Sequence, residues 1–275
     1  MSRRKLTSYT ITFFLFIAFA ISFFPIYMAI TNSFKTIGEI FNSVLSFPTE
    51  LNIDNYIQAY NRINWPRSTL NTFIVSMIGV IGIIFAGSLA GYKLSRYRGK
   101  LSNIIYFLFI ASMLVPFHAI MIPLNKVALN LSVQGSIWGL GLIYIGLGVN
   151  LAIFLCHGFV KSIPREIEEA ANIDGCGEFQ TFFRIVFPLL LPIIFTIGII
   201  QFLWIWNDFL LALIMLPDQS NYTIVLATNV LFGEFVNEWD IILAALILAV
   251  IPVVILFIFF QKSIIEGLVK GAVKG

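Results

Sequence analysis

The sequence predicts an all-α integral membrane protein with six transmembrane helices. Of its 275 residues, 59% are hydrophobic and only 11% are charged, whereas a soluble domain carries about 25% charged residues. This composition excludes a soluble globular protein, a disordered chain and a disulfide scaffold. A β-barrel would show short segments of alternating hydrophobicity instead. A spanning helix needs about 20 apolar residues, and six stretches qualify: residues 9–30, 70–92, 103–123, 136–157, 188–210 and 241–260.

The first stretch, residues 9–30, follows three basic residues, so a cleaved signal peptide is an alternative to a spanning helix. Its apolar run exceeds the roughly 7–15 residues of the apolar region of a signal peptide, and no small-residue cleavage pattern follows it. We therefore interpret it as an uncleaved first span. Residues 31–69 mix prolines, asparagines and short amphipathic runs, which predicts a partly helical external cap.

The second and fourth stretches carry glycines at helical spacing. Small residues let helix backbones approach closely in lipid, so we expect these two spans to be buried among the others. The glycines are Gly79, Gly82, Gly87 and Gly91 in the second stretch, and Gly139, Gly141, Gly146 and Gly148 in the fourth.

The basic residues predict the orientation in the membrane. With a cytoplasmic amino terminus, 13 of the 17 Lys and Arg residues, Arg98 and Lys274 among them, fall in inside segments, and acidic residues such as Glu234 lean outside. This division obeys the positive-inside rule and places both termini in the cytoplasm. The net charge of +3 therefore reflects orientation, and no nucleic-acid partner is expected. The four outside basic residues are Lys35, Arg62, Arg67 and Lys126.

Neither a disulfide nor a metal site is expected. Cys156 and Cys176 both fall on the cytoplasmic side, where thiols stay reduced. His118 and His157 lie on different spans and have no clustered carboxylates, so the spacing of metal ligands is missing. We expect these four residues to be packing and interface groups.

The loop between the fourth and fifth stretches predicts a cytoplasmic helix followed by a turn. Pro164 suits the first turn of a helix, and acidic residues follow it, near the positive end of the helix dipole. Gly175 can end this helix in a left-handed conformation. An apolar stripe at helical spacing is expected on one face; its members are Ile163, Ile167, Ala170 and Ala171.

A second short helix is expected over residues 177–186, after which Pro188 opens the fifth span. The two helices would form a helix–turn–helix with a small, apolar surface. We expect this surface to bind a protein partner. The alternative is that it lies against the membrane.

The same loop resembles the cytoplasmic signature of the permease subunits of binding-protein-dependent ABC importers. Glu169-Ala170-Ala171 is followed after three residues by Gly175, and after nine more by Ile185-Val186-Phe187-Pro188. The family pattern has Leu where this chain has Phe187, which is an apolar exchange. The resemblance implies a loop that couples the permease to an ATPase, formed by Glu169, Ala170, Ala171, Asp174, Gly175, Ile185 and Pro188.

Other motifs resemble the carbohydrate-importer branch of this family. They are Asn32-Ser33-Phe34-Lys35 with Asn55-Tyr56, the run Gly91 to Tyr97, Trp206-Asn207-Asp208-Phe209, and the carboxyl end from Gln261 to Gly275. The length and this tail are similar to the shorter, second permease of the maltose, glycerol-phosphate and oligosaccharide importers. The resemblance divides the chain into residues 1–67 (tail, first span and external segment), the permease core at 68–262 and a cytoplasmic tail at 263–275.

The resemblance also implies the partners and the location. They are a second, homologous permease, two ATPase subunits at the cytoplasmic loop, an external solute-binding protein and a sugar, in a bacterial or archaeal cytoplasmic membrane. ATP and magnesium would bind to the ATPase subunits. This chain is expected to bind no cofactor and to be no enzyme, because its Gly99-Lys100 is followed by Leu101 and does not form a phosphate loop.

Polar residues inside spans are costly unless they face a cavity or a neighbouring helix. The candidates for a solute path or outer gate are Asn150, Gln201, Trp204, Asn207 and Asp208. The alternative is that they form hydrogen bonds between helices.

Two other functions were weighed against sugar import. An importer of polyamines, phosphate or other small ions is the alternative within the family. A secondary transporter would place more ionisable residues deep in its spans, where this chain has only Asp208 and the marginal His118. An intramembrane enzyme would need a nucleophile–base pair or a metal set, and no such pattern is seen.

Overall fold

The computed structural model describes residues 3–97, 99–232 and 238–272, and within these ranges it contains helices and no strands. Arg98, Glu234 and Lys274, which entered the orientation argument, lie outside the described residues. The chain divides into two compact units, Met1–Pro66 with Ala227–Val254, and Arg67–Leu226 with Ile255–Gly275.

The first unit contains α1 (Arg3–Asn32), α2 (Ile37–Asn42), α3 (Asp54–Arg62) and the first part of α13 (Trp239–Ala272). Within α1, Ile11–Asn32 is long and apolar enough to cross a membrane. Its side chains from residue 11 to residue 26 are all exposed, as suits a helix in contact with lipid. The first and sixth predicted spans therefore correspond to α1 and to Trp239–Phe259 of α13.

A buried polar network ties the end of α1 to the segment that follows it. Lys35 is fully buried and donates hydrogen bonds of 2.9 Å to Asn32 Oδ1 and to the carbonyl of Ser43. Asn55, in the first turn of α3, donates to the carbonyls of Ser33 and Lys35 at 2.9 and 2.8 Å. Because buried polar groups need such partners, the network holds residues 33–55 together as the partly helical cap that the sequence predicts.

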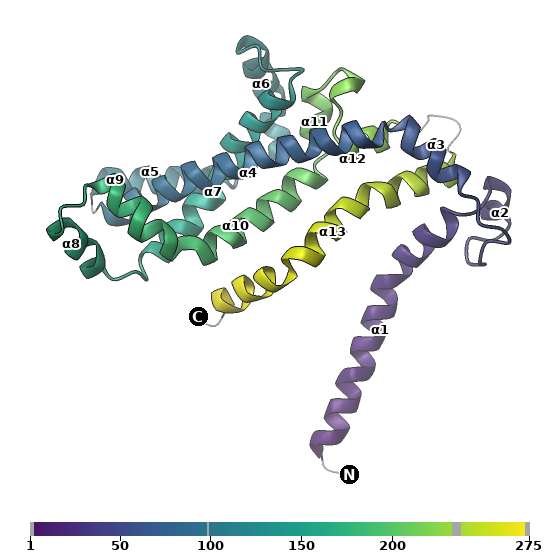
Figure 1. The fold of residues 1–275 in the computed structure, drawn as a ribbon, viewed down its shortest axis with the longest axis horizontal. Coiled ribbons are helices and arrows are strands. Elements are labelled where there is room, and N and C mark those ends of the chain that lie inside the picture. Colours follow the sequence, from purple (N-terminus) through teal and green to yellow (C-terminus); the bar gives the residue numbers. More distant parts are fainter. Residues whose placement is uncertain (1–2, 98, 233–237, 273–275) are drawn as a thin grey trace. The chain divides into compact units, whose positions relative to one another are not determined.

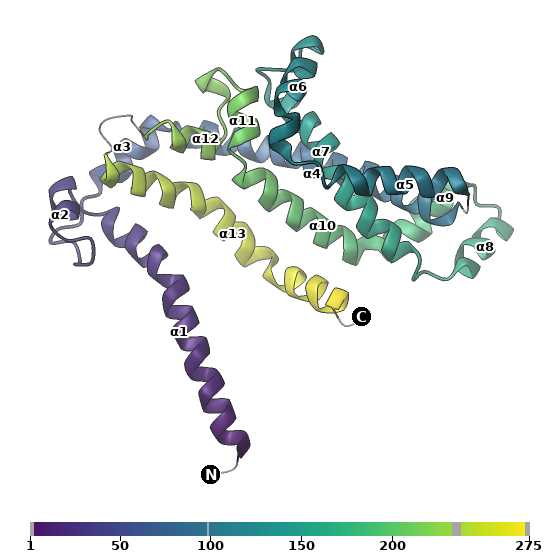
Figure 2. The same cartoon turned by 180° about the vertical axis from the view of Figure 1, so that it is seen from behind.

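The second unit holds most of the helices, and Figure 1 and Figure 2 show three of its long helices, α4, α7 and α10, lying alongside one another with α8 and α9 at one end. In chain order the helices are α4 (Trp65–Arg96), which begins two residues before this unit, α5 (Lys100–Ser112), α6 (Phe117–Asn130), α7 (Ile137–Val160), α8 (Arg165–Ile173), α9 (Glu178–Thr181), the π-helix η1 (Phe182–Val186), α10 (Phe187–Asn207), α11 (Leu210–Met215), the 3₁₀-helix η2 (Gln219–Asn221) and α12 (Ile224–Asn229), whose last three residues belong to the first unit.

Glycines bring α4 and α7 into close contact, as their spacing predicts. A Cβ atom on Gly87 would lie 2.3 Å from the Cβ of Ala152, and one on Gly91 would lie 2.8 Å from the Cβ of Cys156. The two helices can approach this closely only because glycine has no Cβ atom at these positions. Gly146 takes no part in this packing, because a Cβ there would meet no atom within 4 Å.

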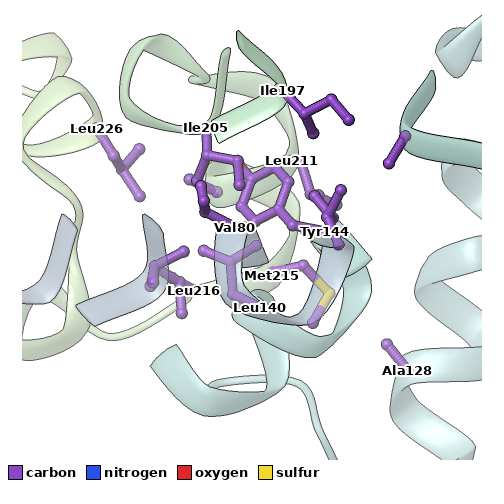
Figure 3. Packing of buried hydrophobic residues seen from close by; sticks show 14 of the residues in the cluster. Val80, Ala128, Leu140, Tyr144, Ile197, Ile205, Leu211, Met215, Leu216 and Leu226 are labelled. Atoms are coloured by element: carbon purple, nitrogen blue, oxygen red, sulfur yellow. The ribbon is translucent and has the colours of Figure 1, made fainter. Parts of the chain in front are cut away.

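The main apolar core of this unit surrounds Tyr144 of α7. Figure 3 shows its ring among Ile205 of α10, Leu211 of α11 and Val80 of α4. All four side chains are buried. The core therefore joins the three long helices to the short helix α11.

The third predicted span is not one straight helix, so the prediction over residues 103–123 was wrong in this respect. α5 ends at Ser112, α6 begins at Phe117, and the two are bent by 104°. Pro116 precedes α6 in an extended conformation, and a proline disfavours the helical conformation of the residue before it. The described residues thus contain five helices long and apolar enough to cross a membrane, or six if the bent pair is one span.

The fifth span differs from its prediction at both ends. It is continuous with α9 and η1 as one helical stretch, Glu178–Asn207, so the expected separate helix over residues 177–186 is part of it. At the other end α10 stops at Asn207, not at residue 210, because Asp208 is extended (φ −74°, ψ 132°) and α11 begins at Leu210.

Candidate functional site

The turn that ends α8 has the geometry that its sequence predicts. α8 begins after Pro164 and ends at Ile173, and Gly175 has a φ of +83°. The backbone N–H of Cys176 donates to the carbonyl of Ala171 at 3.0 Å, which satisfies one of the free carbonyl groups at the helix end. A left-handed glycine is thus the stop signal of α8.

One face of α8 and the turn beside it are exposed and largely apolar. Ile173 is 86% exposed and Phe179, in α9, is 75% exposed. Ile167, Glu169 and Ala170 are exposed as well. Large apolar side chains this exposed at the end of a loop mark an interaction surface when they gather together.

The opposite face of α8 packs inside the chain, and here the predicted apolar stripe was wrong. Ala171 is only 4% exposed and Ile163 is buried, whereas Ile167 and Ala170 face outward. Pro164, before α8, has an extended backbone (φ −57°, ψ 137°), so Ile163 is not part of the helix. Within α8 the inward face instead runs through Glu168 and Ala171, three residues apart, because the Glu168 carboxylate is held against α4.

Glu168, one of the acidic residues that follow Pro164, holds α8 in place, a role that the sequence did not predict. It is 9% exposed. Its carboxylate accepts hydrogen bonds from the Tyr92 hydroxyl at 2.9 Å and from Arg96 Nε at 2.7 Å, both in the last turns of α4. Arg96 and Tyr92 are four residues apart and so share a helix face, a sequence signal that could have indicated a carboxylate partner.

Three further contacts join α4 to this loop. The guanidinium of Arg96 also donates to the carbonyl of Ile163 at 2.9 Å, and Arg165 donates to the carbonyl of Arg96 at 3.1 Å. Lys93 and Glu178 form a second ion pair at 2.8 Å, which is exposed. Asp174 is also exposed and forms no part of these contacts.

Below α8, the loop is supported by an apolar cluster that includes Ile163, Phe182 and Val186. Phe182 and Val186 lie in η1, which leads without a break into α10. Ile185 is half-buried and Pro188 is exposed. The loop is therefore supported at its base by this cluster, while the tip of α8 is exposed.

The polar residues proposed for a solute path fall into two groups. Gln201 is 3% exposed and donates to the carbonyl of Gly148 in α7 at 3.1 Å. Asp208 is half-buried and accepts hydrogen bonds from the Tyr144 hydroxyl at 2.8 Å and from the backbone N–H of Leu211 at 3.0 Å. Both side chains thus connect helices, as the alternative interpretation expects.

The other three candidates make no side-chain hydrogen bond to another helix among the described residues. Trp204 is 40% exposed and packs edge-on against Tyr144, with ring centroids 5.4 Å apart. Asn207 is exposed and donates only to the carbonyl of Leu203, in its own helix, at 2.7 Å. Asn150 is half-buried and has no hydrogen-bond partner among the described residues. Trp204 and Asn207 are one turn apart on the exposed face of α10.

Comparison with known proteins decides the family. The family model described as "binding-protein-dependent transport system inner membrane component" matches residues 79–269. The chain belongs to this family of permeases. The matched range contains the whole of the α8–α9 loop and all five candidates for the solute path or outer gate.

Known permeases match this permease along almost all of its length. It is 34% identical to the probable starch degradation products transport system permease protein AmyC of Thermoanaerobacterium thermosulfurigenes, over 100% of both chains. It is 38% identical to the melibiose/raffinose/stachyose import permease protein MelC of Bacillus subtilis, over 92% of both chains.

A solved structure has the same fold as this permease. It is a chain in the crystal structure of a bacterial ABC transporter involved in the import of the acidic polysaccharide alginate. The TM-score is 0.82 at 21% identity, and the match covers 95% of this permease and 98% of that chain.

Within the described residues of the permease, no three His, Cys, Asp or Glu side chains form a group that could hold a metal ion. The features that the site does offer are an exposed apolar tip on α8, a buried carboxylate behind it, and aromatic and amide groups on α10.

Proposed function

We propose that this permease is a subunit of an ABC importer that moves a sugar or sugar-derived solute across the cytoplasmic membrane. The similarity to AmyC and MelC, both named as permeases for sugars, supports the substrate class. The single observation that carries the mechanism is the exposed apolar tip of α8, with Ile173 86% exposed above a firmly packed base.

The tip of α8 is the proposed contact with an ATPase subunit. A permease can be driven by a separate ATPase only if the two interact differently in two states of the cycle, and such an interaction needs a surface that does not deform on its own. α8 meets this requirement because Glu168 and Ala171 fix one face, while Ile173 and Ala170 stay free on the other. Glu169 and Asp174, both exposed, would flank the contact.

In this proposal the partners divide between the two sides of the membrane. Two ATPase subunits, which bind ATP and magnesium, meet the α8–α9 loops of this permease and of a second, homologous permease in the cytoplasm. An external solute-binding protein delivers the sugar at the side where residues 33–55 form the cap. Both termini are cytoplasmic, in agreement with the distribution of Lys and Arg.

For the solute path we propose Trp204, Asn207 and Asn150, and we assign Gln201 and Asp208 to helix contacts. An aromatic ring with one open face suits the apolar face of a sugar ring, and Trp204 is 40% exposed. The amides of Asn207 and Asn150 have donors and acceptors left for hydroxyl groups.

Uptake by cells that depend on this permease tests the proposal. Cells that carry the complete importer and a matched strain without this permease are given radiolabelled maltotriose, raffinose, putrescine and phosphate in turn. We expect permease-dependent uptake of at least one of the two sugars and its loss in Trp204→Ala. Permease-dependent uptake of putrescine or phosphate alone would contradict the sugar assignment and favour the small-ion alternative.

A further inference from the structure

Two ion pairs join the last turns of α4 to the α8–α9 loop, and they differ in burial. The side chains of Arg96 and Glu168 are only 14% and 11% exposed, whereas those of Lys93 and Glu178 are 59% and 80% exposed. An exposed pair contributes little. Removing one partner of a buried ion pair strongly destabilises a protein. The contact between α4 and α8 that contributes most to stability is therefore the one made by Glu168.

The geometry of the contact with Glu168 opposes both rotation and translation of α8 relative to the end of α4. Tyr92 and Arg96 reach the same carboxylate from two successive turns of α4, at 2.9 and 2.7 Å. Arg165, at the start of α8, donates in the opposite direction to the carbonyl of Arg96. Any displacement of α8 relative to the end of α4 would therefore break several hydrogen bonds at once.

We infer that Tyr92, Arg96 and Glu168 form a clamp that transmits movement of α8 to the membrane helix α4. This inference rests on the proposed role of α8 as the contact with the ATPase. α8 has a covalent route to α10, because α9 and η1 run into that helix without a break. The clamp supplies a second route, so that a displacement of the loop moves α4 and α10 together.

The clamp residues are positioning residues in this account, because their side chains contact one another and not the proposed partner surface. A purely structural role would also make their removal harmful, so stability alone cannot test the idea. The readout must follow movement of α4 when nucleotide binds elsewhere in the assembly.

Hydrogen exchange of the complete importer in lipid nanodiscs supplies this readout. Exchange is measured with and without ATP, magnesium and vanadate, for wild type, Glu168→Gln, Tyr92→Phe and the matched control Lys93→Gln/Glu178→Gln. In wild type and in the control we expect nucleotide to change exchange in residues 165–175 and in residues 90–97. In Glu168→Gln the response of 165–175 persists, while that of 90–97 falls roughly tenfold, as expected when hydrogen bonds to a charged group are weakened.

Three results would overturn the inference. An undiminished response of residues 90–97 in both Glu168→Gln and Tyr92→Phe would show that α4 does not depend on the clamp. Loss of the ATPase from the Glu168→Gln complex would show that Glu168 shapes the docking surface instead. A wild-type response confined to residues 165–175 would refute the clamp and leave the proposed function intact, whereas no wild-type response at 165–175 would refute the proposed function itself.

Discussion

The phenol of Tyr144 donates a hydrogen bond of 2.8 Å to the carboxylate of Asp208, at the point where α10 ends. The same carboxylate oxygen accepts the backbone N–H of Leu211 at 3.0 Å, in the first turn of α11. One oxygen atom thus joins α7 to the break between α10 and α11, and stabilises the start of α11 in the manner of a helix cap.

Removal of this carboxylate should destabilise the permease. Asp208→Ala leaves the buried hydroxyl of Tyr144 without its partner, and we expect a loss of about 1–3 kcal/mol in the free energy of unfolding. Asp208→Asn keeps an oxygen that can accept one of the two hydrogen bonds and should lose less. Thermal unfolding of the purified proteins in detergent measures the difference. Equal unfolding temperatures for wild type and both variants would contradict this role.

Close contact between α4 and α7 should not tolerate a methyl group at Gly87. The added Cβ would lie 2.3 Å from that of Ala152, so the helices must separate, at a cost of about 1–3 kcal/mol. Gly198→Ala is the matched control, because its Cβ would meet Ile84 Cδ1 at an ordinary 3.5 Å. Thermal unfolding should rank Gly87→Ala well below wild type and Gly198→Ala near it. The reverse order would contradict this packing.

The cap on α1 should weaken at low pH through Glu39. Hydrogen bonds from the Thr49 hydroxyl and from the backbone N–H groups of Thr36 and Thr49 lower the pKa of Glu39 from its ordinary value of 4.5 to about 2. Because the folded pKa lies below the unfolded one, this contribution to stability is complete above pH 4.5 and is lost as the pH falls toward 2.

The amide protection of residues 37–42, corrected for intrinsic exchange rates, measures this effect. Wild type should be better protected than Glu39→Gln at neutral pH, and the advantage should shrink as the pH falls below about 4.5. A difference that does not depend on pH would show that the charge of Glu39 has no part in holding the cap.

Hydrophobicity and the turn residues predicted most of the fold, but they missed a break inside one apolar stretch. Long apolar runs locate α1, α4, α7, α10 and α13, since lipid demands closed helices. Gly175 was predicted as a left-handed helix stop, and its φ of +83° confirms it. The sharp bend at Pro116 was missed because α5 and α6 are both apolar, so hydrophobicity alone does not separate them.

At the candidate site, too, the sequence predicted one part of the structure and missed another. The position of the loop was predicted, but the inward face of α8 runs through Glu168 and Ala171 and not through Ile167 and Ala170, because Glu168 is held by Tyr92 and Arg96 of α4. Ala171→Asp would therefore disturb the packing of α8 inside the chain and is no test of a partner surface. Glu168 could not be told from Glu169 by spacing alone, since only the last turns of α4 decide which of the two is buried.

The orientation of the permease should follow the positive-inside rule. In a background with Cys176→Ser, where the remaining Cys156 is fully buried, a cysteine that replaces the exposed Lys100 should react only with a reagent that enters the cytoplasm. A cysteine that replaces the exposed Gln58 should react from outside with an impermeant maleimide. The opposite labelling pattern would reject the proposed sidedness and the cytoplasmic location of α8.

The most direct test of the account is copurification of the ATPase with Ile173→Asp. This side chain is 86% exposed, so the change should leave folding and membrane insertion intact while it places a charge in the proposed apolar contact. Ile167→Asp and Ala170→Asp extend the test across the same face, and Leu51→Asp, at an exposed position of the cap outside the spans, controls for an added charge elsewhere. We predict normal amounts of permease and loss of the ATPase from the Ile173→Asp complex. Retention of the ATPase by all three α8 variants, with normal solute uptake, would contradict the central claim.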